Sequence, residues 1–323
     1  MTAATIGPAI EVTGLTKSYG EHAVLDGVDL SVPEGTVYAL LGPNGAGKTT
    51  VVNILATLLA PGGGEARVAG FDVQHEPAGV RAAIGVTGQF SAIDELLTGR
   101  ENIRLMADLA HLDRATATAT VTGMLRRLDL VGAADRRAQT YSGGMKRRLD
   151  LGMTLIARPR LIFLDEPTTG LDPRSRRELW AIVREQVADG VTVLLTTQHL
   201  EEADQLADRI GVLDGGRLVA EGTAAELKRR VPGGQVSVQF TDLDHLAAAA
   251  AALPDATTDA EALTLKVPHD GSVVGLRRVL DRLDDDGVAG ITLASADLDD
   301  VFLALTGHAT EASASNMVSV VPA

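Results

Sequence analysis

The chain has 323 residues, a formal net charge of −14 at neutral pH and no cysteine. This length allows more than one domain, and the lack of cysteine excludes disulfides and thiolate metal sites and fits a reducing compartment. The negative charge argues against a general nucleic-acid binder, and aromatic residues, at 3%, are too scarce for a base-stacking surface. No stretch approaches the roughly 18–20 apolar residues that span a bilayer, and the first residues lack the basic region of a secretory signal.

Short β-type runs separated by turns fill residues 10–41. They predict a mostly antiparallel region that leads into a buried strand. Strands and helices then alternate, with strands expected at 84–89, 161–164 and 191–195 and helices after the glycines at 42–47, between about 93 and 140, and after Gly144. This alternation indicates an α/β fold with a parallel sheet covered on both faces.

The composition changes near residue 228. Residues 228–323 contain 7 Lys and Arg and 14 Asp and Glu, so their net charge of −7 is half of the total. Three strand-like runs and an amphipathic helical pattern predict a small α+β domain over residues 228–308, after a first domain over 10–227. The low complexity of residues 309–323 is typical of a disordered tail.

The stretch "GPNGAGKT" matches the P-loop pattern, which requires a strand before it and a helix after it. Both are predicted here. In this pattern the backbone N–H groups converge on phosphates, Lys48 reaches the β- and γ-phosphates, and Thr49 coordinates Mg²⁺. The expected phosphate-binding residues are Gly42, Pro43, Asn44, Gly45, Ala46, Gly47, Lys48, Thr49 and Thr50.

Two carboxylates, Asp165 and Glu166, follow the apolar run "LIFL". They lie at the edge of a parallel sheet where ligands bind. Asp165 suits the position that coordinates Mg²⁺ in P-loop NTPases, and Glu166, on the other side of the strand end, can polarise a water molecule. A solvated acidic turn is the alternative, but such a turn does not need four apolar residues before it.

A second helix start suited to an anion occurs in "YSGGMKRRLD", where Ser142 precedes Gly143 and Gly144. The N–H groups at such a start lie at the positive end of the helix dipole. The basic run that follows, Lys146, Arg147 and Arg148, is interpreted as a charged outer face of this helix rather than as a phosphate site.

Together these motifs resemble an ABC-type ATPase, the nucleotide-binding subunit of a transporter, over residues 10–226. "GPNGAGKTT" resembles the Walker A motif, "LIFLDE" the Walker B motif, "YSGGM" the signature and "TGLD", which ends at Asp172, the D-loop. The resemblance also places Gln89 at the Q-loop, beside Mg²⁺ and the γ-phosphate, and Tyr19 where an aromatic ring stacks on adenine. It implies ATP and Mg²⁺ as ligands, with the metal surrounded by Thr49, Gln89 and Asp165.

More narrowly, the chain is similar to the daunorubicin/doxorubicin-resistance ATPases of ABC-2-type exporters. This likeness is carried by the stretches "TGQFSAIDELLTGRENI", "YSGGMKRRLDLG", "LDEPTTGLDPRSR" and "LLTTQHLEEADQLADRI", and "LDDVFLALTGH" extends it to about residue 308. It implies an ATP-hydrolysing motor, peripheral at the cytoplasmic face of the cell membrane, that powers efflux of a drug, antibiotic or lipid through a separate ABC-2-type permease.

The same resemblance implies a homodimer. In the ABC arrangement, Ser142, Gly143 and Gly144 cap the γ-phosphate that is bound by the P-loop of a second chain. Two anion-binding helix starts in one chain therefore predict two chains arranged head to tail. The negative net charge predicts no nucleic-acid partner.

The H-loop departs from the family pattern. Most cassettes have Thr-Thr-His there, whereas this chain has Thr196, Thr197, Gln198 and His199. Gln198 aligns with the switch histidine, and the alternation of strand side chains predicts that His199 faces away. A glutamine amide can hydrogen-bond the γ-phosphate or the attacking water but takes up no proton at physiological pH. Gln198 is therefore assigned a positioning role and Glu166 the general-base role, with a displaced His199 as the alternative.

Three other functions are weighed against an exporter motor. A soluble ABC ATPase of DNA repair needs a long coiled-coil insertion, but only 53 positions separate Gln89 from Ser142, and a translation type needs a second P-loop. A regulatory module without turnover does not need Lys48, Asp165 and Glu166 together. An importer ATPase is the runner-up within transport.

Overall fold

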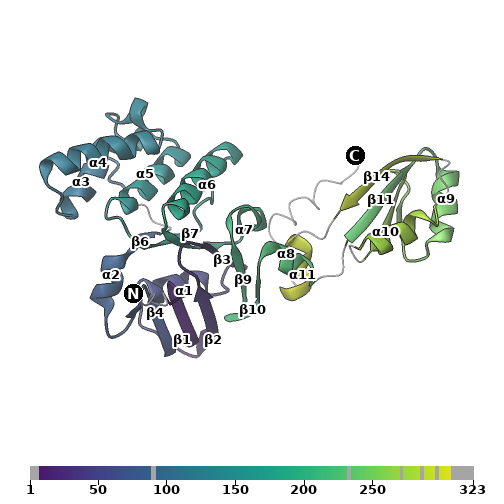
Figure 1. Ribbon diagram of the computed structural model, residues 1–323, viewed down its shortest axis with the longest axis horizontal. Coiled ribbons are helices and arrows are strands. Elements are labelled where there is room, and N and C mark those ends of the chain that lie inside the picture. The colour runs from purple at the N-terminus through teal and green to yellow at the C-terminus, as the bar shows by residue number, and fades with distance from the viewer. Residues whose placement is uncertain are drawn as a thin grey trace, which may run out of the picture. The chain divides into compact units, whose positions relative to one another are not determined.

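The computed structural model describes residues 7–88, 92–230, 234–269, 272–283, 287–294 and 298–306. The chain divides into two compact units, Met1–Glu221 and Gly222–Ala323 (Figure 1). The predicted tail at 309–323 lies outside the described residues. Among the described residues, no helix combines the length and the apolar character that crossing a bilayer requires.

A six-stranded sheet forms the centre of the first unit, with the strand order β10-β9-β3-β8-β7-β6. Its strands are β3 (Val37–Leu41), β6 (Ile84–Thr87), β7 (Leu161–Asp165), β8 (Thr192–Thr197), β9 (Arg209–Asp214) and β10 (Arg217–Gly222). From β6 through β7, β8 and β3 to β9, all neighbours are parallel. Every residue of β3, β7 and β8 is buried, which explains their continuous apolar runs. The predicted parallel sheet is confirmed.

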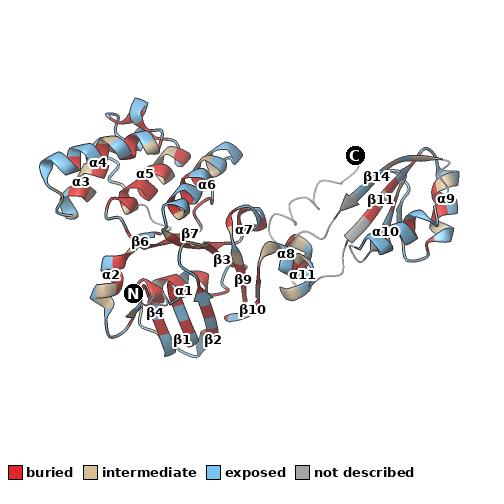
Figure 2. Ribbon diagram, viewed as in Figure 1, coloured by how far each residue is buried: buried red, intermediate tan, exposed pale blue. Residues whose placement is uncertain are grey.

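A second, antiparallel sheet has the order β2-β1-β4-β5. It consists of β1 (Ile10–Tyr19), β2 (His22–Val32), β4 (Gly63–Val68) and β5 (Phe71–Asp72). Its buried side chains pack with those of helix α1 (Lys48–Leu55) and of the central sheet in one hydrophobic core. Figure 2 colours the buried residues of these elements red. This core anchors both ends of the loop between β3 and α1.

The remaining helices of the first unit are α2 (Pro77–Ala83), α3 (Gly99–Leu109), α4 (Arg114–Arg127), α5 (Gly143–Leu155), α6 (Pro173–Ala188) and α7 (Leu200–Leu206). Helices α3, α4 and α5 follow one another between β6 and β7 and form the helical region (Figure 1). Helix α3 begins with a capping box in which Thr98 and Glu101 each bond the other's backbone N–H. Helices α5 and α6 contact each other, so the helical region is joined to the helix that follows β7.

The second unit contains an antiparallel sheet of order β12-β13-β11-β14. Its elements are β11 (Gly234–Phe240), α9 (Leu243–Ala252), β12 (Thr257–Asp259), β13 (Thr264–His269), α10 (Val273–Leu280) and β14 (Val288–Ala294). Helices α9 and α10 pack on β13 over a core that includes Val236, Val238 and Leu265. In the same unit, α8 (Ala224–Lys228) contacts α11 (Leu298–Thr306). The small α+β fold predicted for this part of the chain is confirmed.

Candidate functional site

The loop between β3 and α1 ends in a helix start without a side-chain cap. Gly47 precedes α1 with φ of 105°, a conformation that side-chain-bearing residues rarely adopt, and a Cβ there would lie 2.7 Å from Leu25 Cδ2. The first turn of α1 contains no acidic residue. Since the first N–H groups of a helix have no intrahelical acceptor, this start suits a phosphate. The loop exposes Asn44 and Gly45 and buries Ala46, while Thr50 is half-buried.

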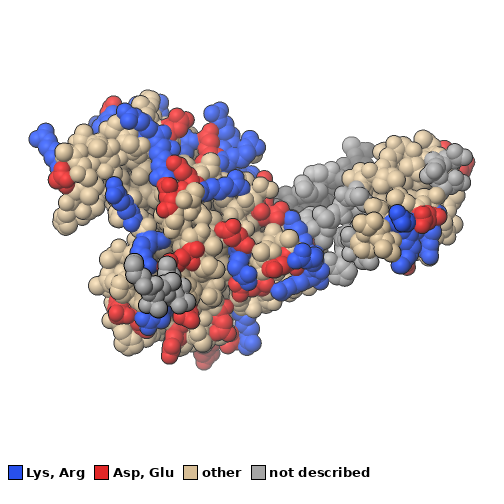
Figure 3. All heavy atoms as spheres, viewed as in Figure 1, with Lys and Arg blue, Asp and Glu red and all other residues tan. Residues whose placement is uncertain are grey.

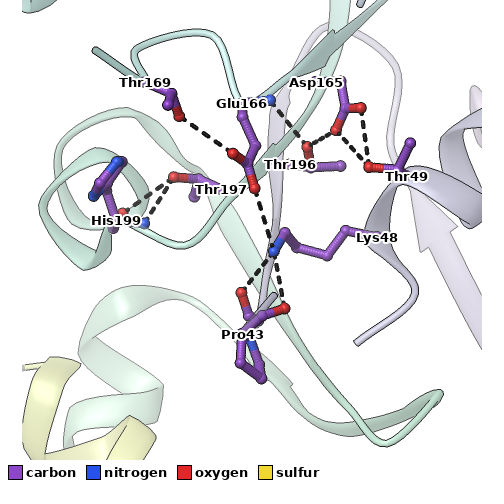
Figure 4. A network of polar contacts seen from close by, with 10 residues as sticks. Pro43, Lys48, Thr49, Asp165, Glu166, Thr169, Thr196, Thr197 and His199 are labelled. Atoms are coloured by element: carbon purple, nitrogen blue, oxygen red, sulfur yellow. Dashed lines mark hydrogen bonds and ion pairs between the residues drawn. The ribbon is translucent and has the colours of Figure 1, made fainter. Parts of the chain in front are cut away.

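Lys48 is a buried cation whose nearest counter-charge is Glu166. Its Nζ donates to the carbonyl oxygens of Gly42 at 2.8 Å and Pro43 at 3.1 Å, and lies 3.6 Å from Glu166 Oε1 (Figure 4). The side chain is 5% exposed. Burial lowers the pKa of Lys48, while Glu166 and Asp165 oppose this shift. A phosphate beside the ammonium would offset the cost of its burial, so the residues present fit such a group.

Thr49 and Asp165 bring oxygen atoms together next to the lysine. Thr49 Oγ1 donates to Asp165 Oδ2 at 3.0 Å, and Asp165 also accepts a hydrogen bond from the Thr196 hydroxyl. The Asp165 side chain is buried at the end of β7. A hydroxyl and a carboxylate are the hard oxygen ligands that Mg²⁺ prefers, so this pair fits the metal. Gln89, the third expected ligand, lies outside the described residues.

Glu166 leaves β7 in an unusual backbone conformation. Its φ is 46°, and its N–H donates to both Thr196 O and Thr196 Oγ1 at 3.1 Å. Its carboxylate faces Lys48 and accepts a hydrogen bond from Thr169 Oγ1 at 3.2 Å (Figure 4). The two acids therefore diverge, Asp165 toward Thr49 and Glu166 toward Lys48. Thr196 is a site residue that the sequence did not single out, because its neighbours Gln198 and His199 carry the recognisable motif.

The end of β8 lies against the P-loop. Gly42 N donates to Thr197 O at 3.2 Å, and the half-buried Gln198 follows directly. His199 N donates to Thr197 Oγ1 at 2.9 Å, and in Figure 4 the His199 ring points away from Lys48. The backbone at Gln198 is thus close to both the P-loop and the end of β7, to which β8 is paired.

Helix α5 is the second helix start with an anion-site pattern. Ser142 is its N-cap, with Oγ accepting from Met145 N at 3.3 Å, and Gly143 is exposed. Gly144 is buried against α6, where a Cβ would lie 2.3 Å from Ser175 Oγ. Only glycine allows α5 to approach α6 so closely.

Asp172 is the N-cap of α6. Its carboxylate accepts hydrogen bonds from Ser175 N at 2.9 Å, Arg174 N at 3.0 Å and Ser175 Oγ at 2.8 Å. The backbone and hydroxyl of Ser175 keep the pKa of Asp172 below its usual value. The stretches "YSGGM" and "TGLD" therefore meet within one chain, through Gly144 and Ser175.

Known proteins are similar to this chain in both sequence and fold. A family model described as ABC transporter matches residues 25–169. The daunorubicin resistance ATP-binding protein DrrA2 of Streptomyces coeruleorubidus is 49% identical over 312 residues, which cover 94% of this chain and 97% of that protein. The chain belongs to the ABC transporter family, in the group of daunorubicin- and doxorubicin-resistance ATP-binding proteins.

The chain is also similar to an export ATP-binding protein and to solved structures of ATP-binding cassettes. The Nod factor export ATP-binding protein I of Rhizobium meliloti (strain 1021) is 38% identical, covering 93% of this chain and 88% of that protein. A solved structure described as the ATP-binding subunit of an ABC transporter is 30% identical, with a TM-score of 0.62 over 69% of this chain and 92% of that one. A dimeric ATP-binding cassette in a post-hydrolysis state with ADP and Pi bound is 26% identical, with a TM-score of 0.61 over 66% of this chain and 98% of that one. The resemblance predicted from the motifs is confirmed.

The basic run of this ABC cassette does not form an outer charged face, so that interpretation was wrong. Arg147 and Arg148 are largely buried, and Lys146 pairs with Glu95. Arg148 pairs with Glu178 of α6, and Arg147 points toward the ends of β6 and β7. Helix α5 is covered by α6 on one side and by the sheet edge on another. The side chains of Arg147 and Arg148, which the sequence suggests are at the surface, therefore face inward.

Tyr19 ends β1 and is 54% exposed as a residue, and the Lys17 ammonium lies 5.6 Å from its ring centroid. The ring packs in no buried core and is available for stacking on a base.

A buried acid on α7 gives this ABC cassette a testable pH dependence. Glu202 is 1% exposed, and its Oε1 accepts from Trp180 Nε1 at 3.2 Å. Burial raises its pKa, and the hydroxyls of Thr197 and Thr168 and the charge of Arg147 only partly oppose this. An acid with a raised folded-state pKa stabilises the fold most below its unfolded pKa, and this stability is lost as the pH rises through the folded pKa.

Glu202→Gln keeps an acceptor for Trp180 but cannot ionise. We therefore expect its melting temperature to gain a few degrees on the wild type as the pH is raised from about 5 to about 8. The control is Glu201→Gln, the same change at the exposed neighbouring position. Parallel melting curves for wild type and Glu202→Gln across this range would contradict the expectation.

Proposed function

We propose that the chain is the ATP-hydrolysing motor subunit of an export system, which powers efflux of a drug, antibiotic or lipid through a separate ABC-2-type permease. The convergence of Lys48, Thr49, Asp165 and Glu166 at one edge of the parallel sheet carries this proposal. It is supported by 49% identity to a daunorubicin resistance ATP-binding protein and 38% identity to a Nod factor export ATP-binding protein.

Hydrolysis follows from what these residues can do. Tyr19 stacks on adenine, and the loop from Gly42 to Thr50 holds the phosphates. Thr49, Asp165 and Gln89 would hold Mg²⁺, which would neutralise phosphate charge. The Lys48 ammonium is paired with Glu166 at 3.6 Å.

A bound phosphate replaces Glu166 as the partner of the Lys48 ammonium. The Glu166 carboxylate can then accept a proton from the attacking water. The loop N–H groups and Lys48 stabilise the negative charge of the transition state, which is the main source of catalysis in phosphoryl transfer.

The proposed assembly is a homodimer in which Ser142, Gly143 and Gly144 of one chain contact the nucleotide of the other, and Asp172 lies beside it. The dimeric ADP-bound cassette of similar structure supports this arrangement. The dimer would be peripheral at the cytoplasmic face of the cell membrane, attached through its permease. On the face of the first unit in Figure 3, basic and acidic side chains are interspersed. Such a mixed surface argues against a nucleic-acid partner, which would require a basic face.

The partner is tested by expressing the chain together with a candidate multi-span permease of the ABC-2 type. The proposal expects detergent-stable co-purification and ATP-dependent movement of a drug or lipid into inside-out vesicles. Movement in the opposite direction would assign the chain to import, and no association with membrane proteins would contradict a transport role.

Gln198 and His199 can be separated by single substitutions. Gln198 directly follows β8, and continued strand alternation would turn its side chain to the side of Thr196 and Asp165. The His199 ring is turned away from Lys48 (Figure 4). We expect Gln198→Ala to lower ATP turnover by about 10- to 100-fold, because the amide that positions water or phosphate is lost. His199→Ala is the matched control and should stay near the wild-type rate. The reverse pattern in a phosphate-release assay would assign the role to His199.

A further inference from the structure

The side chain of Arg147 joins three backbone segments around the proposed catalytic acids. Its Nε donates to Pro167 O at 2.9 Å, Nη1 to Gly88 O at 3.0 Å and Nη2 to Asp165 O at 3.0 Å. The side chain is 14% exposed, and Asp150 Oδ2, at 3.6 Å from Nη1, supplies a counter-charge. All three guanidinium nitrogens are thus used, each on a different carbonyl.

Two of these carbonyls flank Glu166 along the chain. Asp165 O belongs to the peptide bond before Glu166, and Pro167 O lies just after it. Glu166 has φ of 46°, although a residue that precedes proline strongly prefers extended backbone. Such a conformation persists only when its surroundings fix it from several sides. Thr196 holds the Glu166 N–H, and Arg147 holds the carbonyls on both sides.

The third carbonyl connects this turn to the neighbouring strand of the sheet. Gly88 directly follows β6, which is paired with β7. Arg147 itself lies on α5, one turn after Gly143 and Gly144. One planar side chain therefore ties the start of α5 to the ends of β6 and β7.

We infer that Arg147 is a positioning residue for hydrolysis, which sets the backbone of Glu166 according to the position of helix α5. The inference rests on the proposed function, since it concerns Glu166 as general base. A helix start that contacts the nucleotide of the partner chain is thereby connected to the general base of its own chain. A guanidinium can do this because its N–H groups form a rigid planar fork, whereas a lysine ammonium is a single point on a flexible stem.

The test compares the same substitution at two adjacent positions. Arg148 pairs with the single carboxylate of Glu178, so Arg148→Lys preserves its contact, while Arg147→Lys cannot reach three carbonyls at once. We expect Arg147→Lys to lower kcat for ATP at least about tenfold with KM within about twofold, because the P-loop is untouched. Arg148→Lys should keep kcat within about twofold of wild type.

A second readout is independent of turnover. Amide hydrogen exchange in the peptide that contains residues 166–169 should be faster in Arg147→Lys than in wild type or Arg148→Lys. If Arg147→Lys does not fold, Arg147→Gln, which keeps a planar amide with two N–H donors, replaces it in both assays.

The two hypotheses fail in different ways. A folded wild-type protein without ATP turnover contradicts the proposed function, and the exchange measurement still decides the role of Arg147. Unchanged kcat in Arg147→Lys beside an active wild type, unchanged exchange, or an equal loss in kcat and in ATP affinity would each overturn the inference alone.

Discussion

Replacing Glu166 by glutamine is expected to reduce ATP turnover by about 10²- to 10⁴-fold, because an amide cannot accept the proton of the attacking water. The fold should be unaffected. A glutamine side chain retains an oxygen that can accept the hydrogen bond from Thr169, and the backbone of this turn is held by Thr196 and Arg147. Steady-state phosphate release measures the effect.

The same variant tests the pairing of Lys48 with Glu166. Removing the carboxylate charge frees the ammonium 3.6 Å away, so binding of a fluorescent ATP analogue should be equal to or tighter than in wild type. Glu34→Gln, at an exposed glutamate that pairs with Arg160, is the control and should leave both turnover and binding unchanged. Undiminished turnover in Glu166→Gln would remove Glu166 as the general base.

The second large effect is expected for Gly143→Asp. A Cβ at Gly143 would meet only Leu171 Cδ2 at 3.8 Å, and an acidic residue in the first turn of a helix interacts favourably with the helix dipole. The isolated chain should therefore be at least as stable as wild type. In the dimer, however, the aspartate would face a phosphate of the partner site, and we expect turnover to fall by about 10²-fold or more.

Gly123→Asp is the matched control, because a Cβ at this exposed glycine of α4 meets nothing within 4 Å. Gly144→Ala is a poor probe of the partner site, since its Cβ would collide with Ser175 Oγ in its own chain. A loss of activity there would not distinguish the two causes. Wild-type turnover in Gly143→Asp would contradict the role of this helix start.

Mixing the two inactive variants tests whether the site is shared between chains. In a head-to-tail dimer of one Glu166→Gln chain and one Gly143→Asp chain, one site carries both substitutions and the other carries neither. Random mixing should then restore up to about a quarter of wild-type turnover. If the helix start served the nucleotide of its own chain, every site would carry one substitution and the mixture would stay inactive.

Much of this site was predictable because its motifs are local. Each motif is a contiguous stretch: the P-loop glycines with Lys48, and the acids after "LIFL". The strand and helix that flank each motif can also be predicted from the sequence. Burial of β7 and β8 on both faces produces continuous apolar runs, so the parallel sheet was predictable as well.

The remaining features depend on packing between distant segments. Arg147 and Arg148 are adjacent basic residues. Arg147 donates to three backbone carbonyls, whereas Arg148 pairs with a carboxylate of α6. No feature of the neighbouring sequence distinguishes these two roles. The positive φ of Glu166 runs against the preference imposed by Pro167, and Thr196 acts through a strand pairing that no short motif records.

The contact between Gly144 and Ser175 also limits how this sequence can change. Since a single added carbon at position 144 already collides with the serine hydroxyl, any bulkier side chain at position 175 would push α5 away from α6. Residue 175 lies outside the phosphate-binding motifs. From the sequence alone it would be interpreted as a helix surface position that tolerates substitution. Its permitted size is set instead by a glycine 31 positions earlier, so the two positions are free to vary only together.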